Sequence, residues 1–272
     1  TVLYVPATAL LVYFFFAVGY LFSQGGAMNI VIAKKKSSTY LFLAAILLSA
    51  IFFISIAQVL TKEYLAARYY VQSAVAVSSD KNIDSADALL KKSIALRPHD
   101  VYYRGYAELS ALKAQVIASQ ASAEGQTISD EARAAAFEEI NVAKKYADMA
   151  VASNPKNYTN YQFAGSIYQI DPEGSQKALQ LFTQSLDLYP YNPNAYFAIA
   201  RSKAAAGDTE GAIEALKKTL EVGPLHTEAL LSAAQISLQE KKTDEALSLL
   251  VRAYQSDRSR SDILLSVASL QA

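Results

Sequence analysis

Histidine and cysteine, the side chains that most often act as bases, nucleophiles and transition-metal ligands, are scarce in this chain. Its 272 residues include two histidines and no cysteine, which excludes disulfides, zinc–thiolate sites and thiol chemistry. His99 directly follows Pro98, and His226 stands two residues after Pro224. Neither has a histidine, cysteine or pair of carboxylates at ligand spacing. We therefore interpret both histidines as exposed loop residues and predict no catalytic residue and no metal site.

Phosphate and nucleic-acid chemistry is equally unsupported. The ten glycines form no phosphate-cradling loop, since Gly25 and Gly26 stand in a short interhelical segment and the others occur singly. The 25 basic and 25 acidic side chains leave no net charge, whereas a nucleic-acid partner requires clustered cations. We expect no cofactor, no nucleic-acid partner and no enzymatic activity. The tripeptide Asn157-Tyr158-Thr159 is a glycosylation sequon, which matters only in a glycosylating secretory pathway.

Two long runs without a charged residue stand near the start, at residues 3–22 and 39–60. Each can cross about 30 Å of hydrocarbon as a helix. A secretory signal is the alternative for the first run and a buried core helix for the second. However, no basic segment precedes the first run, and the second lacks the polar stripe of a soluble helix. We therefore predict two transmembrane helices in residues 1–62. Thr1 is not an initiator methionine, which is compatible with a fragment of a longer chain.

The short segment between the two runs carries three consecutive lysines, Lys34–Lys36. Positive residues in short loops stay on the cytoplasmic side, so we expect a cytoplasmic loop with both ends of the chain outside. Everything after Leu60 is then extracytoplasmic, in the periplasm or at the cell surface. Lys62 and Arg68 reduce this asymmetry of charge. A patch for anionic lipid headgroups is a second interpretation of the lysines and fits the same topology.

Past Leu60 the sequence repeats itself. The interval from Pro190 to Pro224 recurs from Pro224 to Arg258, and its length of about 34 residues is typical of helix-pair repeats. Twelve and eight residues before each of four prolines there is a small residue and then a second apolar residue. These pairs are Ala86 and Leu90, Ala143 and Ala147, Ala178 and Phe182, and Ala212 and Leu216. Such a pattern suits a helix that approaches its partner closely at one turn and fills space at the next.

The boundary at residues 190–193 shows how one unit ends and the next begins. Pro190 lacks an amide proton and ends the preceding helix. Asn192 can cap the following helix, and Pro193 can occupy its first position.

With this pattern the segment from about residue 63 to residue 272 resembles the tetratricopeptide repeat family. The stretch AGDTEGAIEALKKTLEVGP, residues 206–224, is close to the family consensus, and residues 241–258 are the same unit with Arg258 in place of the proline. The resemblance implies an all-α fold in which about five antiparallel helix pairs stack into a right-handed α-solenoid. Its concave groove would be lined mostly by the first helix of each pair.

One repeat departs from the regular length. Pro98 and Pro155 are separated by more than one repeat interval but by less than two, so we place an insertion near residues 114–135. We expect an extended first helix from about Asp100 to Ala121, a short loop, and a second helix capped at Ser129. The insertion is either a tolerated surface extension or a projection that binds a partner. Residues 171–174 indicate a turn slightly longer than the standard turn of the repeat.

The resemblance also implies a set of ligand-contacting residues on the first helices. They are Arg104, Glu108, Gln162, Ser166, Phe197, Arg201, Leu231 and Gln235. Ordinary helix surface is the alternative for each of them. The strip lacks the lysine and asparagine set with which some family members clamp a C-terminal carboxylate, so that class of ligand is disfavoured.

Residues 261–272 indicate a terminal helix in the phase of a first helix, with Leu264 at the position of Leu230. An end helix of a solenoid normally has a polar outer face, but this one is apolar on most sides. We expect Leu265 and Leu270 to lie at an association surface for another copy, another protein or the membrane surface.

The order of parts also resembles the C-terminal portion of O-antigen ligase-like or polymerase-like bacterial membrane proteins, whose catalytic spans would lie upstream of this sequence. Two hypotheses follow. The first is a membrane-anchored scaffold for protein–protein interaction or self-assembly. The alternative is the accessory domain of a glycan-transferring enzyme.

Overall fold

The computed structural model describes residues 36–79, 82–123 and 129–271. The predicted first membrane run and most of the basic loop lie outside the described residues. Regular structure within the described ranges is helical throughout, with no strand. The predicted all-α fold is therefore confirmed.

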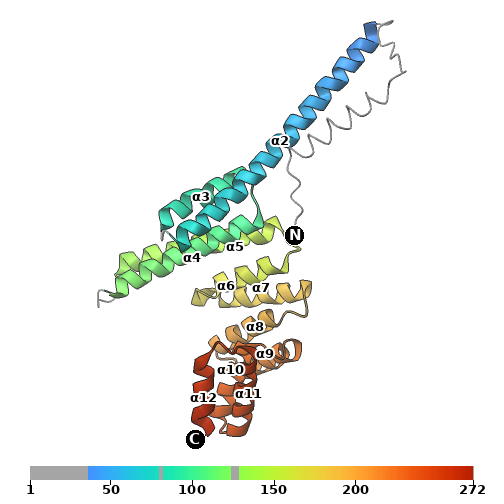
Figure 1. The fold of residues 1–272 in the computed structure, drawn as a ribbon. Helices are drawn as coiled ribbons and strands as arrows, with labels where there is room; N and C mark the ends of the chain where they lie inside the picture. The colour runs from blue at the N-terminus through green and yellow to red at the C-terminus, as the bar shows by residue number, and fades with distance from the viewer. Residues whose placement is uncertain (1–35, 80–81, 124–128, 272) are drawn as a thin grey trace.

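Within these ranges five helix pairs stack in chain order, followed by one further helix (Figure 1). The pairs are α2 (Lys36–Ser78) with α3 (Ile83–Leu96), α4 (Asp100–Ala123) with α5 (Asp130–Ser153), α6 (Tyr158–Tyr168) with α7 (Ser175–Leu188), α8 (Pro193–Ala205) with α9 (Thr209–Val222), and α10 (Thr227–Gln239) with α11 (Thr243–Ser256). Helix α12 (Ser261–Gln271) packs on α11. We call the first helix of each pair the A helix and the second the B helix.

Helix α2 is by far the longest of these helices, at 43 residues, and half of it projects beyond the stack (Figure 1). No glycine or proline interrupts residues 36–78, so nothing in the sequence breaks the helix. The predicted boundary between residues 62 and 63 falls inside it. No side chain between residues 46 and 60 is buried, whereas Ala66, Ser73 and Ala76 are buried in the array. Among the described helices, one stretch is long and apolar enough to cross a membrane, Ile46–Ser78.

The B helices bury the residues that the repeat pattern predicts. Both members of all four predicted pairs are less than 9% exposed, and so are Ala246 and Leu250 in α11. A third equivalent position, about one turn later in each B helix, is also completely buried. Its residues are Ser93, Ala150, Ser185, Thr219 and Ala253. Two of these hydroxyls hold the pairs together, because Ser93 Oγ donates to the Ala66 carbonyl (2.8 Å) and Ser185 Oγ donates to the Tyr158 carbonyl (3.1 Å).

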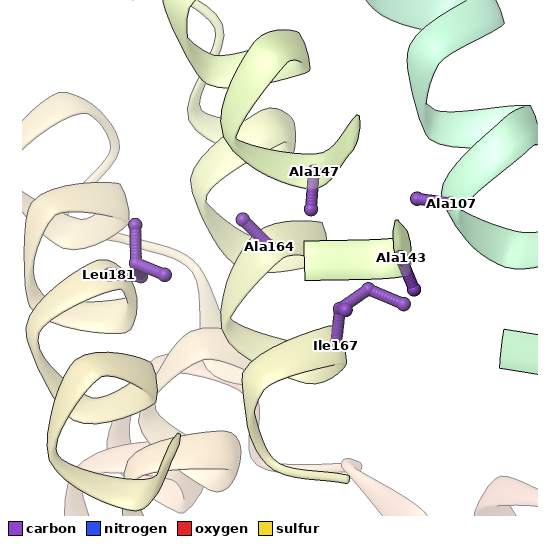
Figure 2. Packing of buried hydrophobic residues seen from close by; sticks show 6 residues of the cluster. All are labelled: Ala107, Ala143, Ala147, Ala164, Ile167 and Leu181. Carbon is purple, nitrogen blue, oxygen red and sulfur yellow. The ribbon is translucent and has the colours of Figure 1, made fainter. Parts of the chain in front are cut away.

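Small residues bring neighbouring pairs into close contact. Figure 2 shows Ala143 and Ala147 of α5 between Ala107 of α4 and Ala164 of α6. All four alanines are fully buried. Gly165 of α6 faces Phe182 of α7, and a Cβ at position 165 would lie 2.6 Å from the Phe182 ring. Alanine and glycine therefore set the helix spacing, and one large side chain fills the remaining space.

The predicted helix ends are confirmed. Asn192 caps α8 by accepting a hydrogen bond from the Asn194 amide, and Pro193 stands in the first turn. Helix α4 is extended, and Ser129 caps α5 by accepting from the Ala132 amide (3.1 Å). The longer turn at residues 171–174 contains a 3-10 helix, Pro172–Gly174.

Helix α12 has one face on the array and one face open. Ile263 and Val267 are buried in a cluster with Leu230 and Leu250. Leu264 stands at the repeat position of Leu230 but is 46% exposed, because no described helix pair follows to cover it. Leu265 is 71% exposed. Leu270, by contrast, is partly buried against the cluster. The association surface predicted at Leu265 and Leu270 stays a prediction.

Candidate functional site

The residue two positions after each repeat-ending proline organises the start of the next A helix. Asn157 and Asn192 accept from the amides of Thr159 and Asn194, and His226 Nδ1 accepts from the Ala229 amide (3.2 Å). In this position stand Asp100, Asn157, Asn192, His226 and, after Arg258, Arg260. We call these five residues the cap row.

Members of the cap row also bind back to the preceding repeat. Asn157 Nδ2 donates to Asp100 Oδ2 (3.0 Å), and Asn192 Nδ2 donates to Gln162 Oε1 (3.0 Å). His226 Nε2 lies 3.0 Å from Asn194 Oδ1, and Arg260 Nη1 lies 2.9 Å from Glu228 Oε1. The cap row therefore connects successive A helices through polar contacts that the buried alanines cannot supply.

Asp100 is the most heavily bonded member. Its Oδ2 accepts from the side-chain amides of Asn154, Asn157 and Asn160 at 3.0 to 3.2 Å. Burial raises the pKa of the Asp100 carboxyl, but the hydrogen bonds from Asn160 and Asn157 and the charge of His99 outweigh it, so the net pKa is below its usual range. The side-chain nitrogen of Asn157, the acceptor residue of the sequon, is thus hydrogen-bonded to Asp100 in the folded chain.

His226 lies in the loop before α10, as predicted, but it is only partly exposed. Its two ring nitrogens contact Ala229 and Asn194, and its ring lies 4.9 Å from that of Phe197. Because Nδ1 accepts from an amide, Nε2 carries the proton and donates to the Asn194 oxygen. Burial lowers the pKa of His226 below its ordinary value. His99 is exposed, as predicted, and its Nδ1 lies 2.8 Å from Asp100 Oδ1.

An apolar cavity of about 780 Å³ opens between α2 and α4. Its walls come from the packed half of α2, from α4 including the predicted insertion, and from α5. The described lining residues are Tyr70, Ser73, Ala74, Val77, Leu90, Gly105, Glu108, Leu109, Ala111, Leu112, Ala114, Gln115, Ala118, Ala136, Ile140 and Ile170. Gly105 lets Tyr70 pack closely on α4, since a Cβ there would lie 2.7 Å from the Tyr70 ring. We call this the apolar cavity.

A second cavity of about 570 Å³ runs across α6, α8 and the start of α10. It is lined by Gln162, Ser166, Gln169, Ile170, Asn194, Phe197, Ala198, Arg201, His226 and Glu228. We call this the polar cavity. Ile170 belongs to the walls of both cavities and is 48% exposed.

Some charged and polar side chains of the polar cavity have a partner among the described residues, and one does not. Glu228 pairs with Arg260 at 2.9 Å, and both nitrogens of His226 have partners. Arg201 is exposed and has no ion pair with any described residue. The polar cavity therefore offers a free cation beside an aromatic ring.

Five of the eight residues predicted from the family resemblance line these cavities. Gln162, Ser166, Phe197 and Arg201 lie together in the polar cavity, and Glu108 lies in the apolar cavity. The structure places the other three elsewhere. The Arg104 Nε is buried without a described hydrogen-bond partner, Leu231 packs against the C-terminal cluster, and Gln235 is exposed.

The sequence interpretation missed His226, Asn194 and Ile170. For His226 a signal existed, because it stands two residues after Pro224 just as the predicted cap Asn192 follows Pro190. Asn194 is two residues beyond Asn192, in the first turn of the helix that Asn192 caps. Ile170 lies in a turn of irregular length, where the repeat register gives no guide. Within the described residues no cluster of three or more histidine, cysteine or acidic side chains is placed to hold a metal ion.

The stacked helix pairs, the cap row and the cavities along the A helices define an α-solenoid of helix-pair repeats. Residues 175–236 match the tetratricopeptide repeat family model. No curated protein matches the chain.

Solved structures share this fold. The chain resembles TTC0263, a tetratricopeptide repeat protein of Thermus thermophilus, with a TM-score of 0.52 and 17% identity over 76% of this chain and 98% of that one. For pilF of Pseudomonas aeruginosa the TM-score is 0.56 at 13% identity, over 77% and 90% of the two chains. For yeast Tom70 it is 0.51 at 18% identity, over 73% of this chain and 35% of Tom70. At these identities the likeness concerns the fold.

Proposed function

We propose that this protein is a membrane-anchored scaffold that recruits a protein segment along the A-helix face of its repeat array. The observation that carries the proposal is the pair of cavities along α2, α4, α6, α8 and α10, one apolar and one polar, with the cation of Arg201 lacking a described ion pair. Cavities of several hundred Å³ with a few convergent polar groups are the usual form of binding sites. The A-helix face is also where the repeat architecture presents an extended concave surface.

The anchor in this proposal is the projecting half of α2. Its residues 46–60 are uncharged and mostly apolar, and none is buried, so water would be a poor environment for them. The lysines at positions 34–36 precede this stretch, and by the rule for short basic loops they favour a cytoplasmic start and an array outside the cytoplasm. The role of accessory domain in a glycan-transferring enzyme stays a prediction that rests on the order of parts.

A second contact surface is proposed at α12, whose open face carries Leu264 and Leu265. An apolar helix face at the end of a solenoid is suited to association, with a second copy of the chain as the simplest partner.

The recruiting face can be tested with two matched variants of the full chain in lipid nanodiscs. Ser166 and Thr183 are both exposed, and each hydroxyl bonds a carbonyl of its own helix, but Ser166 lines the polar cavity and Thr183 does not. Peptides selected from a random phage-displayed library on the wild-type chain should lose binding to Ser166→Trp and keep it for Thr183→Trp. Equal binding to both variants would exclude the polar cavity from the recruiting surface.

A further inference from the structure

The two cavities meet at one side chain. Ile170, in the turn between α6 and α7, lies in the walls of both and is half exposed. Ile170 is therefore the point at which a bound chain would pass from one cavity to the other. The apolar cavity involves the A helices α2 and α4, and the polar cavity involves α6, α8 and α10.

The chemistry of the walls changes at this junction. On the α2 and α4 side, Glu108 is the one charged residue among the described lining residues. On the other side most lining residues are polar, and the cation of Arg201 has no described ion pair. The neighbouring carboxylate, Glu228, is taken by Arg260. A ligand that crosses both cavities therefore meets apolar walls first and an unsatisfied positive charge afterwards.

We propose that the two cavities form one binding track for a single protein segment, with an apolar block between α2 and α4 and an acidic residue that pairs with Arg201. This inference rests on the proposed recruiting function and specifies its partner. Directly packed helices lie roughly 10 Å apart, so four steps from α2 to α10 span roughly 40 Å or more. An extended segment of about 12 residues covers that length.

The Arg201 pair would form beside Phe197, one turn earlier on α8. Phe197 is partly buried and its ring is tilted against that of His226, so the carboxylate would be shielded on one side from water. A guanidinium can bind a carboxylate through two parallel hydrogen bonds. The acidic residue should therefore contribute specificity as well as affinity.

The test uses fluorescent synthetic peptides and the full chain in nanodiscs, with empty nanodiscs as the blank. The probes are an apolar block of leucine and alanine, an acidic block of glutamine, serine and glutamate, the two blocks linked in either order, and the linked peptides with lysine in place of glutamate. If both blocks occupy one track, linking them makes the second contact intramolecular, so one linked order should bind at least about 100-fold more tightly than either block. The lysine version should lose that gain.

Two substitutions distinguish binding along the track from non-specific adsorption of the peptide. Arg201→Gln should lower the affinity for the linked peptide to the affinity for the apolar block alone. Arg133→Gln, on the exposed face of α5, should leave the affinity for the linked peptide unchanged. A photoreactive residue at the middle of the linked peptide should cross-link to the segment that carries Ile170. A linked peptide that binds no more tightly than its better block, or that is insensitive to Arg201→Gln, overturns the single track while leaving the proposed recruiting face intact. Absence of saturable binding by every probe, together with equal library binding to Ser166→Trp and Thr183→Trp, overturns both.

Discussion

At the scale of single residues, the turn between the helices of a pair shows how the repeat constrains backbone conformation. Gly207 has a φ of +81° in the turn between α8 and α9, and Lys241 has a φ of +61° in the turn between α10 and α11. The two positions are one repeat interval apart, as Pro190 and Pro224 are, so both turns place a left-handed residue at the same point. Glycine adopts this conformation without strain, whereas a side chain does so at a cost.

We therefore expect Lys241→Gly to stabilise the array by roughly 1 kcal/mol and Gly207→Lys to destabilise it by a similar amount. No atom lies within 4 Å of a Cβ built at position 207, so the second effect would come from the backbone and not from a clash. Urea unfolding of the full chain in detergent, followed by tyrosine fluorescence, measures both. A stabilised Gly207→Lys variant would contradict the assignment of a shared turn.

His226 should make the C-terminal repeats sensitive to acid. Its folded-state pKa lies below the ordinary value of 6.5 because the ring is partly buried, so the unfolded chain binds the proton more readily. Stability is then complete above about pH 6.5 and falls as the pH drops through and below that value. Protonated Nδ1 can no longer accept from the Ala229 amide, which removes an N-cap worth about 1 kcal/mol.

Hydrogen exchange of the α10 amides between pH 7.5 and pH 5 tests this expectation, after correction for the intrinsic pH dependence of exchange. Protection should fall in the wild-type chain and change much less in His226→Asn, which installs the cap residue found at position 192. Equal loss of protection in both would show that another group is responsible.

At the scale of the elements, the B helices determine how closely the pairs pack. Ala212 of α9 is 5% exposed, while Ala205, the last residue of α8, is exposed. Ala212→Leu should cost about 1 to 3 kcal/mol by overpacking, and Ala205→Leu should have little effect. The same urea unfolding experiment compares them. Equal destabilisation by the two substitutions would show that the assigned repeat phase is wrong.

Much of this element structure could be predicted from the sequence because it depends on local rules. Prolines that lack a donor, capping side chains and alanines at fixed offsets each act within one helix or at its ends, and the structure confirms them at Asn192, Ser129 and the B-helix pairs. The boundary of the array was harder to locate. A change from apolar to mixed composition near residue 62 is visible in sequence, but it does not break a helix that contains no glycine or proline.

The candidate site was predictable only in part, because it depends on contacts between repeats. The family register located Gln162, Ser166, Phe197 and Arg201 on one face. It could not show that the Arg260 side chain occupies Glu228 and leaves Arg201 free, or that Ile170 joins the two cavities. Those facts depend on the angle between successive pairs, which no single helix encodes.

At the scale of the whole molecule, the two ends of the array differ in what they leave open. At one end α2 projects away from the stack, and α12 lies at the other (Figure 1). Leu264 and Leu265 of α12 are exposed. We expect the full chain in detergent to form oligomers at tens of micromolar, and Leu264→Glu plus Leu265→Glu to convert them to monomers. Leu188→Glu, at another exposed leucine, is the control. Light scattering that finds a monomeric wild-type chain would refute association through α12.

Helix α2 gives the molecule its proposed arrangement, since one continuous helix would serve as both the membrane anchor and the first helix of the array. The Glu63 carboxylate pairs with Arg97 at 2.9 Å, which ties the end of α3 to α2 just after the apolar stretch. The array would thus begin directly at the membrane surface, without a linker.

The most direct measurement of this central claim is cysteine labelling on intact cells, which is clean because the chain has no native cysteine. Ser37 stands at the start of α2, and Ser248 is exposed on α11. A membrane-impermeant thiol reagent should label Ser248→Cys on intact cells and Ser37→Cys only after permeabilisation, with both variants remaining in the membrane fraction after alkaline extraction. Labelling of Ser37→Cys alone on intact cells, or release of the chain by alkaline extraction, would contradict an array anchored outside the cytoplasm by α2.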